Sequence, residues 1–390
     1  MYPVLVRRIF WISSIGLIVF LLAVGVVYVA NPLALRTWIL AKSLRSPLSS
    51  VREAAAEALA ARDPEEAVEL FVDARADAAI DDPWYGESYW WFALLPPELA
   101  ENLAGMLEDP DTARAAAAAE GFGVLVHENE DHDFSPLLPA LFRALQKSFC
   151  MAAYALCQIG PEDGDMTTAL LHASREGCPG VLLHLHDMEL SEEQLDELLD
   201  SLAHEDVQLR RWAALALGSR AAYKDRIGPR LVATLGDPND VVTNAVLSSL
   251  KLLGQTDPAT IREVTALLGR EAVRMYAVEF LAGSTSTSPE ALAVVRAALR
   301  NSAEATEFLD ALGNAPPETI SADLIPDLLR LCREGADLDQ RTSAVELLGS
   351  MGPAAKSAVP AIEEILAKNE DEDSFEWAAR AALESIQTAE

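Results

Sequence analysis

The sequence is poor in basic residues and in cysteine, and each shortage argues against a class of protein. Its 390 residues hold 30 Lys and Arg against 61 Asp and Glu, which gives a formal net charge of −31. Phosphate backbones would be repelled by such a field, so we expect no nucleic acid among the partners. Four Cys in a chain of this length are too few for a disulfide framework.

The short motifs that carry catalysis or nucleotide binding are also missing. The sequence contains no Cys-x-x-Cys pair, no Gly-rich phosphate loop and no Gly-x-Ser-x-Gly elbow. The acidic run at 369–373 lacks the glycine and the ligand spacing of a calcium-binding loop. We therefore predict that the protein is not an enzyme and that it holds no cofactor and no metal.

Histidine and cysteine residues are few, and their placement favours structural roles. Segment 127–133 combines His127 and His132 with acidic residues, which could gather a metal in a loop, but a polar interhelical loop is the favoured interpretation. On a helix, His184 and His186 would not share a face. Cys150 and Cys157 would lie about 10 Å apart by helical rise, which exceeds disulfide reach, so we expect small buried apolar residues there.

The first long feature of the chain is an apolar stretch without charge. Residues 9–30 (IFWISSIGLIVFLLAVGVVYVA) would span about 33 Å as a helix, enough to cross a hydrocarbon core. Residues 1–8 precede it as a short basic tail. We predict a single uncleaved transmembrane helix over 9–30, and the alternatives are a cleaved signal peptide and a buried helix.

Positive charge flanks the apolar stretch on both sides. Arg7 and Arg8 precede it with the amino terminus, and Arg36, Lys42 and Arg45 follow it. The short basic tail favours an orientation in which the tail stays inside. The predicted localisation is therefore a single-pass membrane protein whose large domain lies on the extracytoplasmic side.

That large domain is strongly acidic. No Asp or Glu precedes Glu53 whereas six Lys or Arg do, so the chain from Glu53 onward has 24 basic and 61 acidic residues and a net charge of −37. Such a surface would attract basic protein partners, and the attraction would weaken as salt rises. The alternative is that the acidic surface serves solubility alone.

A repeated pattern predicts the fold. Several segments share an apolar or basic opening, an Ala four residues on, a Leu shortly after and often a closing Gly. The anchoring alanines are Ala55, Ala116, Ala153, Ala213, Ala245, Ala277, Ala344 and Ala379. Three gaps between them are close to twice the unit, so we expect degenerate copies at 89–93, 181–185 and 305–309.

Each repeat is predicted to be a pair of helices. An amphipathic stretch, such as 194–202 or 291–299, precedes each alanine-centred helix and carries Leu at i, i+3, i+4 and i+7. Sustained period-two alternation is missing, so strands are not expected. A single pair cannot bury its apolar stripe, but stacked neighbours can, which predicts about eleven stacked pairs over 33–387.

Segments 236–245 and 352–362 resemble HEAT repeats, of the short type grouped with the phycobilisome-lyase HEAT-like units. The resemblance runs through 33–387 and is weakest in 64–108 and 160–190. It implies an all-α fold, a right-handed α-solenoid whose second helices line the concave face and bind other proteins. It implies no chemistry by itself.

In that family an Asp that opens the second helix and an Arg shortly after it tend to form a ladder along the stack. Asp109 with Arg114 and Asp206 with Arg210 match this pattern. Val242 and Glu376 stand where another Arg would be, so the resemblance implies a ladder that is broken in this chain.

An aromatic cluster stands out in the second repeat. Six of the nine residues at 84–92 (WYGESYWWF) are aromatic, and such rings anchor protein interfaces and favour the lipid headgroup zone. They cannot all enter one narrow helical stripe, so we expect at least one large ring to remain partly exposed. Filling a gap between repeats is the favoured interpretation, with partner contact and bilayer contact as alternatives. The candidate contact residues are Trp84, Tyr85, Tyr89, Trp90 and Trp91.

The sequence as a whole predicts a membrane-anchored, non-catalytic scaffold for protein–protein interactions. Its partners would be proteins, with basic proteins as the class that the charge favours, and the membrane through 9–30. The first alternative is an accessory or lyase-like module of the phycobilisome-lyase HEAT type. A purely structural spacer is the second.

Overall fold

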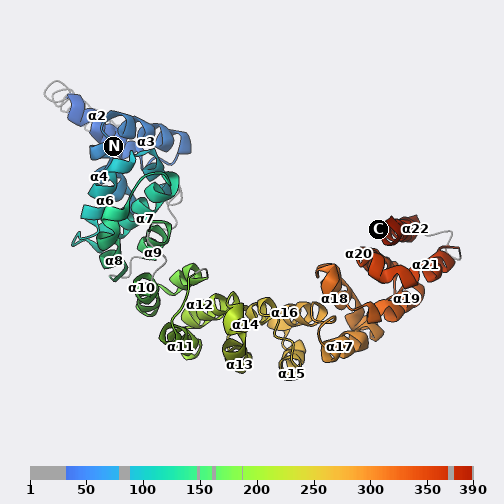
Figure 1. Ribbon diagram of the computed structural model, residues 1–390. Coiled ribbons are helices and arrows are strands. Elements are labelled where there is room, and N and C mark those ends of the chain that lie inside the picture. Colours follow the sequence, from blue (N-terminus) through green and yellow to red (C-terminus); the bar gives the residue numbers. More distant parts are fainter. Residues whose placement is uncertain are drawn as a thin grey trace, which may run out of the picture. The chain divides into compact units, whose positions relative to one another are not determined.

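The computed structural model describes residues 32–78, 88–146, 150–159, 164–186, 188–367 and 373–388. Within these ranges every element is an α-helix or a short 3-10 helix, which confirms the all-α prediction. The chain divides into two compact units, unit 1 (1–184) and unit 2 (185–390), shown in blue to green and in green to red in Figure 1.

Unit 2 is built from helix pairs that follow one another along the chain. The pairs in its described residues are α11 (Glu192–Asp200) with α12 (Val207–Gly218), α13 (Lys224–Thr234) with α14 (Asp240–Leu252), α15 (Pro258–Ala266) with α16 (Glu271–Ala282), α17 (Pro289–Arg300) with α18 (Ser302–Gly313), α19 (Ile325–Glu334) with α20 (Leu338–Ser350), and α21 (Val359–Leu366) with α22 (Asp373–Thr388). Each second helix packs on the second helix of the next pair. We call these helices, which are α12, α14, α16, α18, α20 and α22, the second-helix row.

Short 3-10 helices fill the connections in unit 2. They are η5 (Ser201–Ala203), η6 (Ala221–Tyr223), η7 (Leu267–Gly269), η8 (Pro317–Thr319), η9 (Ala322–Leu324) and η10 (Gly352–Ala358). Side chains cap the helices that follow: Asp206 accepts from the backbone N–H of Gln208, and Asn301 from that of Ala303. Each such cap stabilises its helix by about 1 kcal/mol, so these polar capping residues fix where the second helices begin.

The second-helix row allows very close approach at two glycines. A Cβ at Gly218 would lie 2.7 Å from the Ser249 side chain, and one at Gly349 would lie 2.8 Å from the Ala382 Cα. At the second crossing, the Ser385 hydroxyl also donates to the Gly349 carbonyl at 2.9 Å. The glycine that closes several sequence repeats is therefore the point at which neighbouring helices touch.

Replacing Gly349 by alanine is expected to lower the free energy of unfolding by about 1–3 kcal/mol, because the new methyl group overlaps the α22 backbone. The cost should exceed the gain of up to about 1 kcal/mol in helix propensity. Gly313→Ala is the matched control, since no atom lies within 4 Å of a Cβ built there. Denaturant unfolding measures both variants, and equal stability of the two would contradict the close-contact argument.

Unit 1 is less regular. Its elements are α2 (Pro32–Ser43), α3 (Ser49–Arg62), α4 (Pro64–Ala76), η1 (Tyr89–Leu94), η2 (Pro97–Leu99), α6 (Ala100–Met106), α7 (Thr112–Glu128), η3 (Ser135–Leu137), α8 (Leu138–Gln146), α9 (Cys150–Ile159), α10 (Gly164–Arg175) and η4 (Pro179–Leu185). Helix α7 is central, with α4, α6, α9 and η1 packed against it. Two of the expected degenerate copies, at 89–93 and 181–185, are 3-10 helices, whereas the copy at 305–309 lies in the regular helix α18.

Most of the anchoring alanines occupy the helix contacts expected of them. Seven of the eight are buried, and the exception is Ala116. In α7 the buried alanines include Ala115 and Ala118 instead. Because α7 is surrounded on several sides and carries a run of alanines, spacing alone gave the wrong register there.

The predicted membrane placement needs correction. Among the described helices none is long and apolar enough to cross a membrane. The longest, α7, has 17 residues, short of the roughly 20 that a span requires. This finding contradicts the predicted localisation as a single-pass membrane protein with an extracytoplasmic domain. The stretch 9–30 and the tail 1–8, on which that prediction depended, lie outside the described residues.

Candidate functional site

The aromatic cluster is divided between the core and the surface. Trp84 and Tyr85 lie outside the described residues, and Tyr89 is the first residue of η1. Trp91 is 3% exposed, whereas Trp90 is 55% exposed. The Trp91 ring centroid lies 5.8 Å from that of Phe71 in α4. One of the two adjacent tryptophans thus fills the contact between η1 and α4, and the other faces outward.

Three of the four histidines in unit 1 contact aromatic rings. His127 Nδ1 lies 3.0 Å from the Tyr154 hydroxyl, and the His132 ring packs 4.6 Å from the Phe134 ring. His184 lies 6.0 Å from Tyr154, centroid to centroid. Throughout the described ranges, no group of three or more His, Cys, Asp or Glu side chains could hold a metal ion. These three histidines therefore have packing contacts with aromatic rings.

The expectation for Cys150 was wrong. Cys150 is exposed and forms a disulfide with Cys178, with the two Cα atoms 5.4 Å apart. Cys157 is half-buried and is not part of a disulfide. The pairing was missed because Cys178 lies in another element, after α10, and spacing along α9 carries no information about it.

A ladder of polar side chains runs along the starts of the second helices in unit 2. Arg210 of α12 donates to both carboxylate oxygens of Asp237, at 2.7 and 3.2 Å, and to the carbonyl of His204 at 2.9 Å. The Asp237 side chain is only 7% exposed. Burial alone would raise the pKa of Asp237, but the hydrogen bonds from Arg210 and from the Asn239 backbone hold that pKa below its ordinary value.

The ladder continues where the resemblance implied a break. Arg270, which precedes α16, reaches back to the carbonyl of Asp237 at 2.9 Å and to the carboxylate of Asp240 at 2.5 Å. Arg274 then donates to Glu307 of α18 at 2.8 and 3.2 Å. Where Val242 replaces the expected Arg, the contact comes from Arg270 of the next repeat.

The ion pair expected in unit 1 is also present. Arg114 of α7 donates to Asp109 at 3.0 Å and to Glu69 of α4 at 2.7 Å, and it contacts Asp73 as well. These ion pairs join acidic residues of one helix or loop to arginines of a neighbouring helix.

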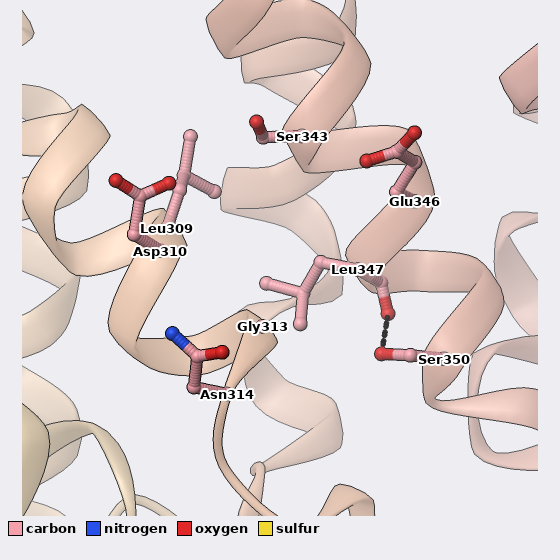
Figure 2. Close-up of a pocket in the computed structure, with 8 residues that line it drawn as sticks. All are labelled: Leu309, Asp310, Gly313, Asn314, Ser343, Glu346, Leu347 and Ser350. Atoms are coloured by element: carbon pink, nitrogen blue, oxygen red, sulfur yellow. Dashed lines mark hydrogen bonds between the residues drawn. The ribbon is translucent and has the colours of Figure 1, made fainter. Parts of the chain in front are cut away.

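A groove of about 460 Å³ separates α18 from α20 on the exposed face of the second-helix row. Figure 2 shows α18 as one wall and α20 as the other. Asp310 and Glu346 bring a carboxylate from each wall, and neither forms an ion pair with any described residue. Asn314, Ser343 and Ser350 add amide and hydroxyl groups, and Ser350 donates to the Leu347 carbonyl at 2.9 Å. The lining residues are Leu309, Asp310, Gly313, Asn314, Ser343, Glu346, Leu347 and Ser350.

The groove is open, and its lining contains no Lys, Arg or His side chain. Its chemistry is that of hydrogen-bond acceptors and negative charge above an apolar floor of Leu309 and Leu347. Sequence reasoning did not single out Asp310 or Glu346. Both fall on amphipathic helices like many other acidic residues, and only the stacking of α18 on α20 places them across one groove.

The sequence matches no protein-family model and no curated protein. Solved structures are similar. Yeast importin-beta (Kap95p) matches with a TM-score of 0.56 and 13% identity, over 90% of this chain and 55% of that one. Kap95p in a structure described as inducing the switch loops of RanGDP to adopt the GTP-bound conformation gives 0.55 and 12%, with the same coverage of 90% and 55%. The karyopherin Kap121p bound to the extreme C-terminus of the protein phosphatase Cdc14p gives 0.51 and 14%, over 91% and 45%.

These likenesses define the class of fold. The protein is an all-helical array of HEAT type, like the karyopherins. The chain spans about half the length of the karyopherins it resembles. Sequence identities of 12–14% support the fold alone.

Proposed function

We propose that the protein is a non-catalytic scaffold that binds protein partners along the exposed face of the second-helix row in unit 2. The observation that carries the proposal is the groove between α18 and α20, where Asp310 and Glu346 pair with no basic residue that the structure describes, whereas acidic residues of the ladder do form ion pairs. Carboxylates left unpaired beside an apolar floor suit a partner that supplies both positive charge and aliphatic surface.

Comparison with the karyopherins supports the same function. The Kap121p structure holds the extreme C-terminus of another protein, so an array of this fold can take a terminal segment as its ligand. We infer that this chain likewise takes a basic protein segment, in keeping with the net charge of −31. The repeat array is proposed to extend over 33–387, with weak repeats at 64–108 and 160–190. No observation on the described residues favours the accessory or lyase-like alternative.

The aromatic cluster is proposed as a second contact surface, on unit 1. Trp90 suits this role because its ring is exposed beside the buried Trp91. Trp84, Tyr85 and Tyr89 remain contact candidates from the sequence, and the burial of Trp91 favours a role in packing.

Reversing the charge of the groove is expected to weaken partner binding by at least tenfold. The variant is Asp310→Lys with Glu346→Lys, which replaces attraction for a basic segment by repulsion. Glu263→Lys with Glu363→Lys is the matched control, because it changes net charge equally at exposed positions of the first helices α15 and α21.

The measurement is affinity capture with residues 33–390, followed by titration of the captured partner at two salt concentrations. The control should bind as the parent protein does, and the groove variant should lose both affinity and salt dependence. Equal weakening by both variants would assign the effect to net charge, and the groove would then not be the site. Recovery of no specific partner by the parent protein would contradict the scaffold function.

A further inference from the structure

The disulfide joins two elements that pack against each other at the end of unit 1. Cys150 is the first residue of α9, and Cys178 follows α10, 28 residues further along the chain. A tight turn positions Cys178: Gly177 has φ of 110°, and the Cys178 N–H donates to the Ala173 carbonyl at 3.0 Å. A glycine tolerates this φ far better than other residues, so the turn is built to aim Cys178 back towards α9.

The bridged repeat has the weakest second element of the described repeats that follow α6. Its second helix is η4, a 3-10 helix of seven residues, whereas second helices in unit 2 have 12 to 16. Hydrogen bonds of 3-10 type are poorer, and a short element buries less apolar surface. Only Val181, Leu182 and Leu185 of η4 belong to the core. The sequence repeat is also weakest in this region, at 160–190.

We propose that the bond between Cys150 and Cys178 is a redox-controlled clamp, which holds the α10–η4 repeat on α9 and releases it when a dithiol reduces the bond. The covalent link compensates for the missing second helix, because it limits the conformations open to α10 once its packing is lost. In the reduced state, the packing of α10 on α8 and α9 remains, and η4 keeps its three core residues and the hydrogen bond that Arg220 donates to the Leu185 carbonyl. The repeat then opens locally while the helices around α7 keep their structure.

The exposures of the cysteines fit exchange at one sulfur. Cys150 is exposed, whereas Cys178 is 1% exposed, so an attacking thiolate reaches the sulfur of Cys150. That attack forms a mixed disulfide with Cys150 and releases the sulfur of Cys178, which takes up a proton. The second thiol of the dithiol then displaces Cys150 as a thiol. The dithiol becomes a cyclic disulfide, and two electrons and two protons pass to the protein.

The other cysteines do not compete for this exchange. Cys332 is buried in α19, and burial raises the pKa of its thiol to about 12, so it is not ionised near neutral pH. Cys157 lies seven residues beyond Cys150 on α9, about 10 Å along the helix. The exchange is therefore expected to be confined to one pair.

Hydrogen exchange of the full chain, with and without dithiothreitol, tests the clamp. A loop of 28 residues corresponds to a stabilisation on the order of several hundred-fold in the opening equilibrium. Amides of α10 and η4 should therefore exchange several hundred-fold faster after reduction, and those of α14, α16 and α18 should not change. Reoxidation should restore protection, which separates the clamp from irreversible unfolding.

Variants complete the test. Cys150→Ser and Cys178→Ser should each show fast exchange in α10 with or without dithiothreitol, and Cys157→Ser should behave as the parent protein does. Alkylation followed by mass measurement should detect two free thiols before reduction and four after it. Protection of α10 that is the same in both redox states would overturn the proposal, and so would four free thiols in the unreduced protein.

Discussion

Replacing Trp91 by alanine is expected to lower the free energy of unfolding of unit 1 by about 3–5 kcal/mol. The ring is 3% exposed and packs against Phe71, which also meets Phe92 edge-on at 6.0 Å. Removing the ring leaves a cavity between η1 and α4. Denaturant unfolding, followed by hydrogen exchange of α4 and α7, measures the loss in the unit concerned.

Two further variants make this prediction specific. Trp90→Ala should change stability by less than about 0.5 kcal/mol, because its ring is 55% exposed. Trp91→Phe should cost less than Trp91→Ala, since it keeps most of the ring and removes an indole N–H that is buried without a hydrogen-bond partner. Similar losses for Trp90→Ala and Trp91→Ala would contradict the division of the cluster between core and surface.

The same pair of residues tests the proposed contact surface. If Trp90 contacts a partner, Trp90→Ala weakens binding with nearly unchanged stability, and its effect separates from that of Trp91→Ala. Partner capture by the two variants provides the measurement. Unchanged capture by Trp90→Ala would leave the groove between α18 and α20 as the proposed contact.

The spacing of the repeats could not predict the local structure around these tryptophans. The degenerate copy expected at 89–93 coincides with η1, which is a 3-10 helix and not an α-helix. Pro96 and Pro97 follow it at once, and the residue before a proline is driven into extended backbone, as Leu95 is with ψ of 144°. The segment before the prolines therefore holds a 3-10 helix of six residues, and η2 and α6 follow it.

Repeat pairing was predictable where the chain obeys its own period. In unit 2 the alanines at 213, 245, 277 and 344 are buried at contacts of the second-helix row, because only a small side chain fits there. Contacts between distant residues were not predictable. The Cys150 bridge and the Arg270 ladder contact each depend on a residue 27 or more positions away. That Asp310 pairs with no basic residue in the described ranges depends on which helix face the stacking leaves open.

Replacing Asp237 by alanine is expected to destabilise unit 2 by about 3–5 kcal/mol, because it leaves the partly buried Arg210 without its carboxylate. The carbonyls of His204 and Glu205 remain as acceptors for Arg210, which places the expected loss towards the lower figure. Asp200→Ala is the control, since its pair with Arg230 is exposed and should contribute less than about 1 kcal/mol. Equal losses in denaturant unfolding would contradict the role of burial.

Lowering the pH should weaken the ion pair between Arg210 and Asp237, because Asp237 becomes protonated. Despite the opposing effect of burial, hydrogen bonds from Arg210 and Asn239 lower the pKa of Asp237 in the folded state below 3.8. Asp237 therefore binds a proton more readily in the unfolded chain than in the folded protein. The stabilisation from its ionised carboxylate is complete above about pH 4 and is lost as pH falls through the folded pKa. Asp237→Asn removes this titrating group, so its stability near neutral pH should drop while its loss below about pH 4 becomes shallower than that of the parent protein. Parallel curves of stability against pH for the two proteins in this acid range would show that the ionised Asp237 does not stabilise the folded protein. Apolar packing alone would then have to stabilise the contact between α12 and α14.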